Sequence, residues 1–172
     1  MTVPSAPNTL GYMNPYASFL AGQDPIQVLS ATPSRLEEIA AVVGESRLNH
    51  KPRPEKWSGR EILVHLADTE LAFAFRYRQA LGEENHVVQP FDQDKWANAY
   101  AVYSAQQALR TYRALREWNL ALIRSLTPAQ MSRPVTHPER GSMILRTLVE
   151  TAAGHDINHL RQLEALATAQ PT

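Results

Sequence analysis

The sequence contains no cysteine among its 172 residues. This absence excludes disulfide frameworks, cysteine nucleophiles and cysteine-ligated zinc. Any metal ion must therefore be held by histidine and carboxylate side chains, and any thiol chemistry must use a thiol from outside the chain. A domain of this length buries about 70% of its unfolded surface on folding and needs no structural metal to hold together. A metal site in this chain would therefore serve a function.

The sequence also lacks an excess of charge of either sign, because 17 Lys and Arg residues balance 17 Asp and Glu residues. Nucleic-acid binding requires positive charge that neutralises phosphates, so we expect no nucleic-acid partner. Long apolar runs are missing too, since no stretch approaches the ~20 apolar residues of a membrane span. The first charged side chain is Asp24, so the basic start of a signal peptide is absent. We expect a cytoplasmic protein that acts on a small molecule and has no membrane partner.

The 12 prolines fall in clusters, and a proline inside a helix removes a hydrogen bond and clashes with the preceding turn. They leave four proline-free windows that are each long enough for a helix: residues 34–51, 55–89, 91–127 and 139–170. Few segments look like strands, because β-branched residues are sparse and strict apolar alternation is absent. We expect an N-terminal arm at residues 1–24 and a helical domain at residues 25–172.

Local signals mark where the first two helices begin. Thr32 followed by Pro33 is typical of an N-cap with proline at the first helical position, and Gly44 offers a stop. Ser58 with Glu61 three residues later predicts a capping box, in which each side chain binds the backbone amide of the other residue. Two roles are open for Glu61: this cap, or a base beside a neighbouring histidine.

Similar signals mark the later helices. Ser104 with Gln107 predicts a second capping box, and Thr127–Gln130 predicts a short helical turn. A last long helix follows Gly141, with an apolar stripe that starts at Ile144. Four amphipathic helices without a sheet predict an all-α protein, a four-helix bundle. The long links on either side of the third helix leave room for crossover connections.

Among the six histidines, those inside helices are the best candidates for chemistry. His155 and His159 are four residues apart, so they project from one face of the last helix at the spacing that lets two imidazoles bind one metal ion. They lie on the stripe that a bundle must bury, together with Leu148 and Leu163. His65 lies on the apolar face of the second helix. Each of two helices therefore turns histidine inward.

A metal ion would use all three imidazoles, whereas burying them without partners would cost about 1–3 kcal/mol each. Three histidine ligands leave a position open for water or substrate, which is typical of catalytic sites. The alternative is that the histidines are hydrogen-bonded core residues, as a single histidine on an apolar face often is. Both readings remain open on spacing alone.

Side chains near the histidines are candidates for supporting roles. Asp68 lies close to His65 on the helical wheel and can accept its free ring N–H. Gln162 lies one turn past His159 and can border an open coordination position. Asp156 points about 100° away from the preceding histidine, so we expect it to meet a neighbouring helix or a loop.

Three arginines at helical spacing, Arg110, Arg113 and Arg116, form a stripe on the third helix. We expect a solvated face, because runs of charge at this spacing usually contact water; the alternative is a surface that attracts an anionic thiol or substrate. Neither a Gly-x-Ser-x-Gly turn nor a phosphate-binding loop is present. Catalysis by this chain would therefore depend on the metal.

Two segments together resemble the DinB-like superfamily, including its YfiT-like metal hydrolases. The first reads Trp-Ser-x-x-Glu-Ile-Leu-x-His-Leu-x-Asp-x-Glu from Trp57. The second reads Gly-x-Met from Gly141 and then His-Asp-x-x-His-Leu-x-Gln from His155. The likeness covers roughly residues 25–168 and leaves the N-terminal arm outside.

This resemblance implies a four-helix bundle with crossover links, a homodimer, and a divalent metal on His65, His155 and His159, for which we expect zinc, nickel or a similar ion. Characterised relatives include transferases and isomerases that use low-molecular-weight thiols such as bacillithiol, mycothiol or glutathione. The resemblance therefore favours an enzyme that transfers such a thiol to or from an electrophile at a three-histidine metal site. The alternatives are a metal-dependent hydrolase and a non-catalytic bundle that binds a small ligand or a protein.

Overall fold

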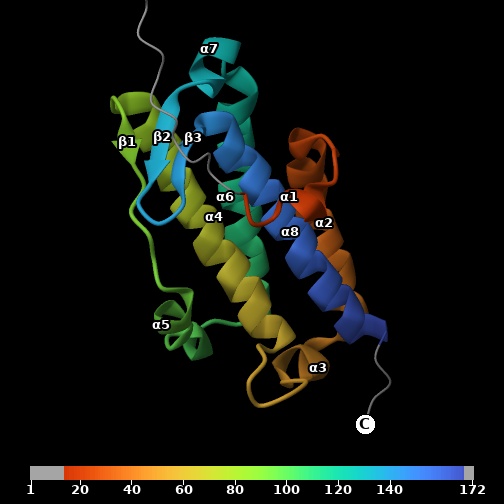
Figure 1. The fold of residues 1–172 in the computed structure, drawn as a ribbon. Helices are drawn as coiled ribbons and strands as arrows, with labels where there is room; N and C mark the ends of the chain where they lie inside the picture. The colour runs from red at the N-terminus through yellow and green to blue at the C-terminus, as the bar shows by residue number, and fades with distance from the viewer. Residues whose placement is uncertain (1–13, 169–172) are drawn as a thin grey trace, which may run out of the picture.

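The computed structural model describes residues 14–168. Within this range, four long helices form a bundle (Figure 1). They are α2 (Pro25–Val43), α4 (Gly59–Gly82), α6 (Ala105–Ser125) and α8 (Leu145–Thr168). The predicted four-helix bundle is confirmed. None of the described helices is long and apolar enough to cross a membrane.

Short helical segments precede and connect the long helices. The first, α1 (Ala17–Leu20), precedes α2, and the others lie in the links: α3 (Glu45–Asn49), α5 (Gln93–Ala97), a 3₁₀ turn at Tyr100–Val102, and α7 (Pro128–Met131). The last of these confirms the helical turn predicted after Thr127. Both predicted capping boxes are present, at the starts of α4 and α6. The short α1 packs against α8, so part of the predicted arm lies on the bundle (Figure 1).

The order of the helices around the bundle differs from a simple up-and-down arrangement. Extensive contacts join α2 to α6 and α8, and join α4 to the same two helices. Consecutive helices α2 and α4 therefore occupy opposite corners, and so do α6 and α8. These diagonal links confirm that the bundle has crossover connections, with one in the expected link between α6 and α8 and one in the link between α2 and α4. The long link between α4 and α6, where a crossover was also expected, joins neighbouring helices and carries α5.

The first long helix begins earlier than expected, which corrects the predicted start at the Thr-Pro pair. Asp24 is the N-cap, and its carboxylate accepts a hydrogen bond from the amide of Ile26 at 2.8 Å. Pro33 therefore lies inside α2, where it has no N–H to donate to the carbonyl of Leu29. Nη1 of Arg116 on α6 donates to that carbonyl instead, at 3.0 Å. A tertiary contact supplies the hydrogen bond that the proline removes.

A small sheet beside the bundle corrects the expectation that no sheet would form. β1 (His86–Val87) pairs parallel with β2 (Pro134–His137), which pairs antiparallel with β3 (Gly141–Ile144). Such short strands give too few residues for apolar alternation to be recognised. Pro134 is tolerated because it is the first residue of its strand. Ile144, expected to begin the buried stripe of the last helix, ends β3 instead and is 36% exposed.

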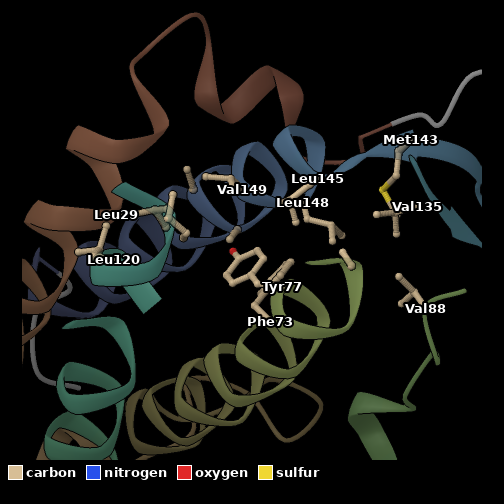
Figure 2. Close-up of a cluster of buried hydrophobic side chains, with 14 of the residues drawn as sticks. Leu29, Phe73, Tyr77, Val88, Leu120, Val135, Met143, Leu145, Leu148 and Val149 are labelled. Atoms are coloured by element: carbon tan, nitrogen blue, oxygen red, sulfur yellow. The ribbon is translucent and has the colours of Figure 1, made fainter. Parts of the chain in front are cut away.

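Two clusters of buried apolar side chains fill the bundle. Figure 2 shows the first, in which Phe73 and Tyr77 of α4 lie beneath Leu148 and Val149 of α8. Met143 and its neighbours on the sheet extend this cluster. The second cluster includes Leu36, Leu63, Leu66, Tyr112 and Leu163.

A layer of buried polar side chains separates the two apolar clusters along α6 and α8. These residues are Arg116, Asn119, His155, Asp156 and His159. Burying polar groups at mid-bundle is costly unless each finds a partner. Because this layer contains buried histidines that need partners, it is where we expect the functional site.

Candidate metal centre

Three histidines from two neighbouring helices meet in the buried polar layer. His65 comes from α4, whereas His155 and His159 come from consecutive turns of α8. Nε2 of His155 lies 3.0 Å from Nε2 of His65 and 3.1 Å from Nε2 of His159. None of the three residues is more than 6% exposed. The structure therefore brings together the three histidines that the sequence singled out.

Burial keeps the three imidazoles neutral. It lowers the pKa of His65 to about 3, and the nearby His159 adds to this effect. Burial likewise lowers the pKa of His155, with smaller contributions from the other two histidines and Arg116. The pKa of His159 is also lowered, again mainly by burial. At neutral pH each ring therefore keeps a lone pair on one nitrogen, which is the form that binds metal ions.

The tautomer of His159 is set by Gln162, which lies on the same helix. Oε1 of Gln162 accepts a hydrogen bond from Nδ1 of His159 at 2.9 Å. Because Nδ1 carries the proton, Nε2 of the same ring directs a lone pair at His155. A proton on Nε2 of His155 can form a good hydrogen bond to Nε2 of His65 or to Nε2 of His159, but not to both. Ring protons therefore cannot make a hydrogen bond of each of these two close contacts.

The three nitrogens fit a metal ion in both chemistry and spacing. Nitrogens bound to a tetrahedral zinc ion lie about 3.4 Å apart, since each Zn–N bond is about 2.0–2.1 Å long. The two shortest separations here are 3.0 and 3.1 Å, and all three nitrogens lie within 4.8 Å of one another. Imidazole suits zinc, nickel, copper and iron alike. Three ligands leave room for a further one, from water or a substrate.

Aromatic side chains cover the histidine cluster. The ring of Trp57 packs on that of His65, with centroids 4.7 Å apart. The ring of Tyr16 meets His155 edge-on, with centroids 5.1 Å apart. The hydroxyl of Tyr100 lies 3.5 Å from Nδ1 of His65, at the long limit of a hydrogen bond. These rings form part of the wall around the cluster.

A family comparison assigns the chain to a known family. The family model of the DinB superfamily matches residues 29–163, a range that contains most of the four long helices and all three histidines. The chain belongs to the DinB superfamily. The resemblance of the two sequence segments is thereby confirmed.

Two curated relatives match most of this DinB-superfamily chain. YfiT of Bacillus subtilis is 29% identical over 147 residues, which cover 80% of this chain and 81% of YfiT. OB0782 of Oceanobacillus iheyensis is 29% identical over 142 residues, which cover 82% of this chain and 83% of OB0782. Both carry the name "putative metal-dependent hydrolase".

Solved structures share the DinB-like fold. The structure of YfiT from Bacillus subtilis, described as having an unusual four-helix bundle topology, matches with a TM-score of 0.77 at 23% identity. The match covers 96% of this chain and 90% of that one. A mycothiol-dependent maleylpyruvate isomerase matches with a TM-score of 0.59 at 13% identity, over 83% of this chain and 57% of that one. The diagonal order of helices is therefore a feature that this chain shares with a solved DinB-like structure.

Glu61 occupies the capping role rather than a place among the histidines. Its Oε2 accepts a hydrogen bond from the amide of Ser58 at 2.7 Å, and its Oε1 lies 3.1 Å from Nζ of Lys51. These contacts lower the pKa of Glu61 against the opposing effect of partial burial. Of the two roles considered for this residue, the structure shows the cap.

The other two predicted supporting residues differ in their contacts. Gln162 binds His159 directly and so orients its ring, which is the task that we had expected Asp68 to perform for His65. Asp68 is half-buried on α4, and burial raises its pKa. At Nδ1 of His65 the structure places the hydroxyl of Tyr100 instead.

A second buried cluster adjoins the histidines and corrects the expectation of a fully solvated arginine stripe. Arg116 is only 1% exposed. Its Nη2 donates to Glu70 at 2.7 Å and its Nη1 donates to Asp156 at 2.6 Å. Asn119 and Tyr112 donate to the same two carboxylates. Asp156 therefore contacts another helix, as predicted, although that helix is α6 at the opposite corner of the bundle. Arg116 faces inward because the carboxylates of Glu70 on α4 and Asp156 on α8 bind it there.

Tyr16 is a site residue that sequence reasoning did not find. It precedes α1 in the segment predicted as an arm, where neither periodicity nor a motif singles it out. Packing of α1 against α8 brings its ring to His155. The signal lies in the tertiary contact rather than in the local sequence.

Proposed function

We propose that this protein is a metal-dependent enzyme in which His65, His155 and His159 hold a divalent ion such as zinc or nickel. The observation that carries the proposal is the convergence of three neutral imidazole nitrogens at separations that ring protons alone do not satisfy. The names of the two bacterial relatives support a metal. Such an ion, when bound, supplies Lewis acidity that lowers the pKa of a water or thiol bound to it.

The reaction that we propose is the transfer of a low-molecular-weight thiol to or from an electrophilic substrate. The chain has no cysteine of its own, so the sulfur must come from a cosubstrate. The fold shared with a mycothiol-dependent isomerase supports such a cosubstrate. In this reaction Gln162 fixes the orientation of His159, while Trp57 and Tyr100 pack against His65.

Metal-dependent hydrolysis is the second candidate function. The names of the two relatives favour it, and a free coordination position accepts water as well as a thiol. The two reactions differ in their need for a cosubstrate. Consumption of an electrophile only when a thiol is present would support thiol transfer. Consumption at the same rate without thiol would favour hydrolysis over transfer.

Elemental analysis of the untagged protein beside His65→Ala and His159→Ala tests the metal site. We expect about one metal ion per chain in the parent and little in either variant, with unchanged helical circular dichroism. Stoichiometric metal in His159→Ala would contradict the three-histidine site. A parent that binds no metal after incubation with Zn²⁺, Ni²⁺ or Mn²⁺ would leave the histidines as core residues and favour the non-catalytic bundle.

We further propose, from the family resemblance, that the protein is a homodimer. Light scattering at micromolar concentration is expected to give twice the 19.3 kDa mass of one chain. A monomer at that concentration would refute the dimer and leave the metal site untouched, because all three histidines come from one chain.

A further inference from the structure

A cavity of about 360 Å³, here called the first cavity, reaches the histidine cluster between α4, α8 and the β2–β3 hairpin. His65 and His155 line it, and so does Thr69, which follows His65 by four residues on α4. Thr69 is only 6% exposed. Residues four apart lie on the same face of a helix, so α4 presents the hydroxyl of Thr69 beside the ring of His65.

The hydroxyl of Thr69 differs from those of the two other buried threonines in residues 14–168, Thr32 and Thr151. A threonine inside a helix can satisfy its hydroxyl by donating to the carbonyl four residues earlier. Thr32 and Thr151 both do so, at 2.9 and 2.6 Å. Thr69 makes no such bond within the described part of the chain, and its Oγ1 lies 3.4 Å from Nε2 of His65 instead.

This contact with His65 is a poor substitute for a bond to the helix backbone. Its length of 3.4 Å exceeds the roughly 2.5–3.2 Å of good hydrogen bonds. The same nitrogen also has a closer neighbour, because Nε2 of His155 lies 3.0 Å from it. Buried hydroxyl groups nearly always have a good hydrogen-bond partner. Thr69 therefore offers a donor at the edge of the first cavity that the protein itself uses only weakly.

Nε2 of His65 is one of the three nitrogens that we propose to hold the metal ion. A nitrogen whose lone pair binds an ion no longer accepts a hydrogen bond, so in that state the hydroxyl of Thr69 loses its contact with His65. Threonine is not among the usual zinc ligands, which are histidine, cysteine and the carboxylates. The hydroxyl is therefore suited to bind a further ligand of the ion rather than the ion itself.

The further ligand is an anion in both candidate reactions. It is a thiolate in thiol transfer and a hydroxide in hydrolysis, since the ion lowers the pKa of a bound thiol or water. A hydroxyl that donates to an anion makes a shorter and stronger hydrogen bond than one that donates to a neutral group. The charged side chains of the first cavity are balanced, because Arg76 and Arg140 are matched by Asp92 and Glu139. Recognition of the anion is therefore left to the ion and to Thr69.

A second cavity, of about 470 Å³, borders the histidine cluster at His159, and Thr69 does not line it. Gln162 does, but its side-chain oxygen already accepts the hydrogen bond from Nδ1 of His159. The location of the Thr69 hydroxyl therefore favours the first cavity as the place of the further ligand.

We propose that Thr69 donates a hydrogen bond to the anionic ligand of the metal ion and so orients that ligand in the first cavity. The proposal rests on the proposed metal site, and it holds for thiol transfer and hydrolysis alike. No covalent bond forms or breaks at Thr69, which keeps its proton and directs it at the ligand.

Azide binding to the Co²⁺-loaded protein tests the proposal. Azide is a small anion that coordinates cobalt and changes its visible absorption, so a titration gives the Kd. Thr69→Val replaces the hydroxyl by a methyl group of similar size and is expected to weaken azide about tenfold, the equivalent of roughly 1.4 kcal/mol. Thr69→Ser keeps the hydroxyl and should bind azide nearly as tightly as the parent. Equal Kd values for the parent and Thr69→Val would overturn the proposal.

Thr151→Val is the matched control, because Thr151 lines the same cavity but donates its hydroxyl to the helix backbone. We expect it to leave the Kd of azide unchanged. The antisymmetric stretch of bound azide in the infrared should move in Thr69→Val and keep its position in Thr151→Val and Thr69→Ser. Equal weakening of azide by both valine variants would overturn the proposal. If Thr69→Val did not fold, Thr69→Ala compared with Thr69→Ser would give the same test.

Measurement of cobalt binding separates this proposal from the proposed function. A parent protein that binds no cobalt refutes the metal site and this proposal with it. Equal cobalt binding and equal azide binding by the parent and Thr69→Val refute the role of Thr69 and leave the metal site intact. Weaker cobalt binding by Thr69→Val would assign the hydroxyl to the support of His65 and would overturn the proposal as well.

Discussion

The buried cluster around Arg116 comprises Glu70, Tyr112, Arg116, Asn119 and Asp156 and is called the Arg116 cluster. In it one guanidinium binds two carboxylates, whereas in the histidine cluster three neutral nitrogens face one another. Both clusters lie in the same buried polar layer, and the consecutive residues His155 and Asp156 of α8 belong one to each. The Arg116 cluster is complete within the protein, because Asn119 and Tyr112 add donors to its carboxylates. In the histidine cluster, by contrast, one proton on Nε2 of His155 cannot serve both of its neighbours.

This difference separates a structural from a functional use of buried polar groups. A complete cluster stabilises the fold only as long as every member is present, since removal of one leaves another buried without a partner. A cluster of neutral imidazoles that can hold a metal ion gains further stabilisation when that ion binds. We therefore expect substitutions in the first cluster to affect folding, and substitutions in the second to affect metal binding.

The largest expected effect is that of Arg116→Met. Loss of the guanidinium leaves Glu70 and Asp156 without their cationic partner in the core, which should lower the free energy of unfolding by about 3–5 kcal/mol. Urea unfolding measures this loss of stability. Arg113→Met is the matched control, because Arg113 pairs with Glu37 at the surface. Loss of that surface pair should lower the free energy of unfolding by about 1 kcal/mol or less. Equal effects of the two variants would show that the Arg116 cluster does not hold the bundle together.

Metal addition should stabilise the parent and fail to stabilise His155→Ala. A ligand bound only by the native state raises the free energy of unfolding by about 2.7 kcal/mol at a hundredfold excess over its Kd. Removal of one of three ligands abolishes the site, so the melting temperature of the variant should not respond to metal or chelator. Thermal melts with and without a chelator measure this. An equal response of both proteins would mean that the ion binds elsewhere.

Gln162→Leu is expected to weaken metal binding about 10–100-fold, the usual cost of losing a side chain that orients a histidine ligand. The variant frees Nδ1 of His159 and no longer fixes its tautomer. Gln162→Glu keeps an acceptor at the same position and should retain most of the affinity. Competition with a coloured chelator gives the Kd of each. Equal affinities of the leucine variant and the parent would show that the hydrogen bond does not support the ligand.

Glu61→Ala should give the smallest effect, a loss of about 1 kcal/mol of stability with unchanged metal affinity. It removes half of the capping box at the start of α4, where caps contribute at this level. Glu61→Gln keeps the hydrogen bond to the amide of Ser58 and should recover most of the loss. Urea unfolding and metal titration of both variants check this. A weakened metal site in Glu61→Gln would restore the role of a base beside His65.

Much of the fold was predictable because its signals are local. Ser58 and Ser104 start helices through partners three residues away, and these capping boxes appear as expected. His155 and His159 share a helix face because four residues make about one turn. The inward side of each helix followed from apolar spacing, which also placed His65 inside the bundle.

The features that the sequence did not predict depend on partners far away in the chain. Pro33 lies within α2 because Arg116, distant in the chain, donates to the carbonyl that the proline leaves without its helical donor. The sequence pattern predicts the same arginine at the surface, whereas in the structure its ion pairs with Glu70 and Asp156 hold it in the core. The short strands form because a hairpin brings them together, not because any one of them has a strand pattern of its own.

The sequence by itself determined the helices, the histidine spacing and the absence of any internal thiol, because each is a property of neighbouring residues or of composition. Only the tertiary structure decided that Tyr100 rather than Asp68 lies at Nδ1 of His65, and that Tyr16 covers His155. These outcomes depend on the packing of one element against another. Local sequence does not set such contacts, because each forms only once elements that are distant in the sequence lie side by side.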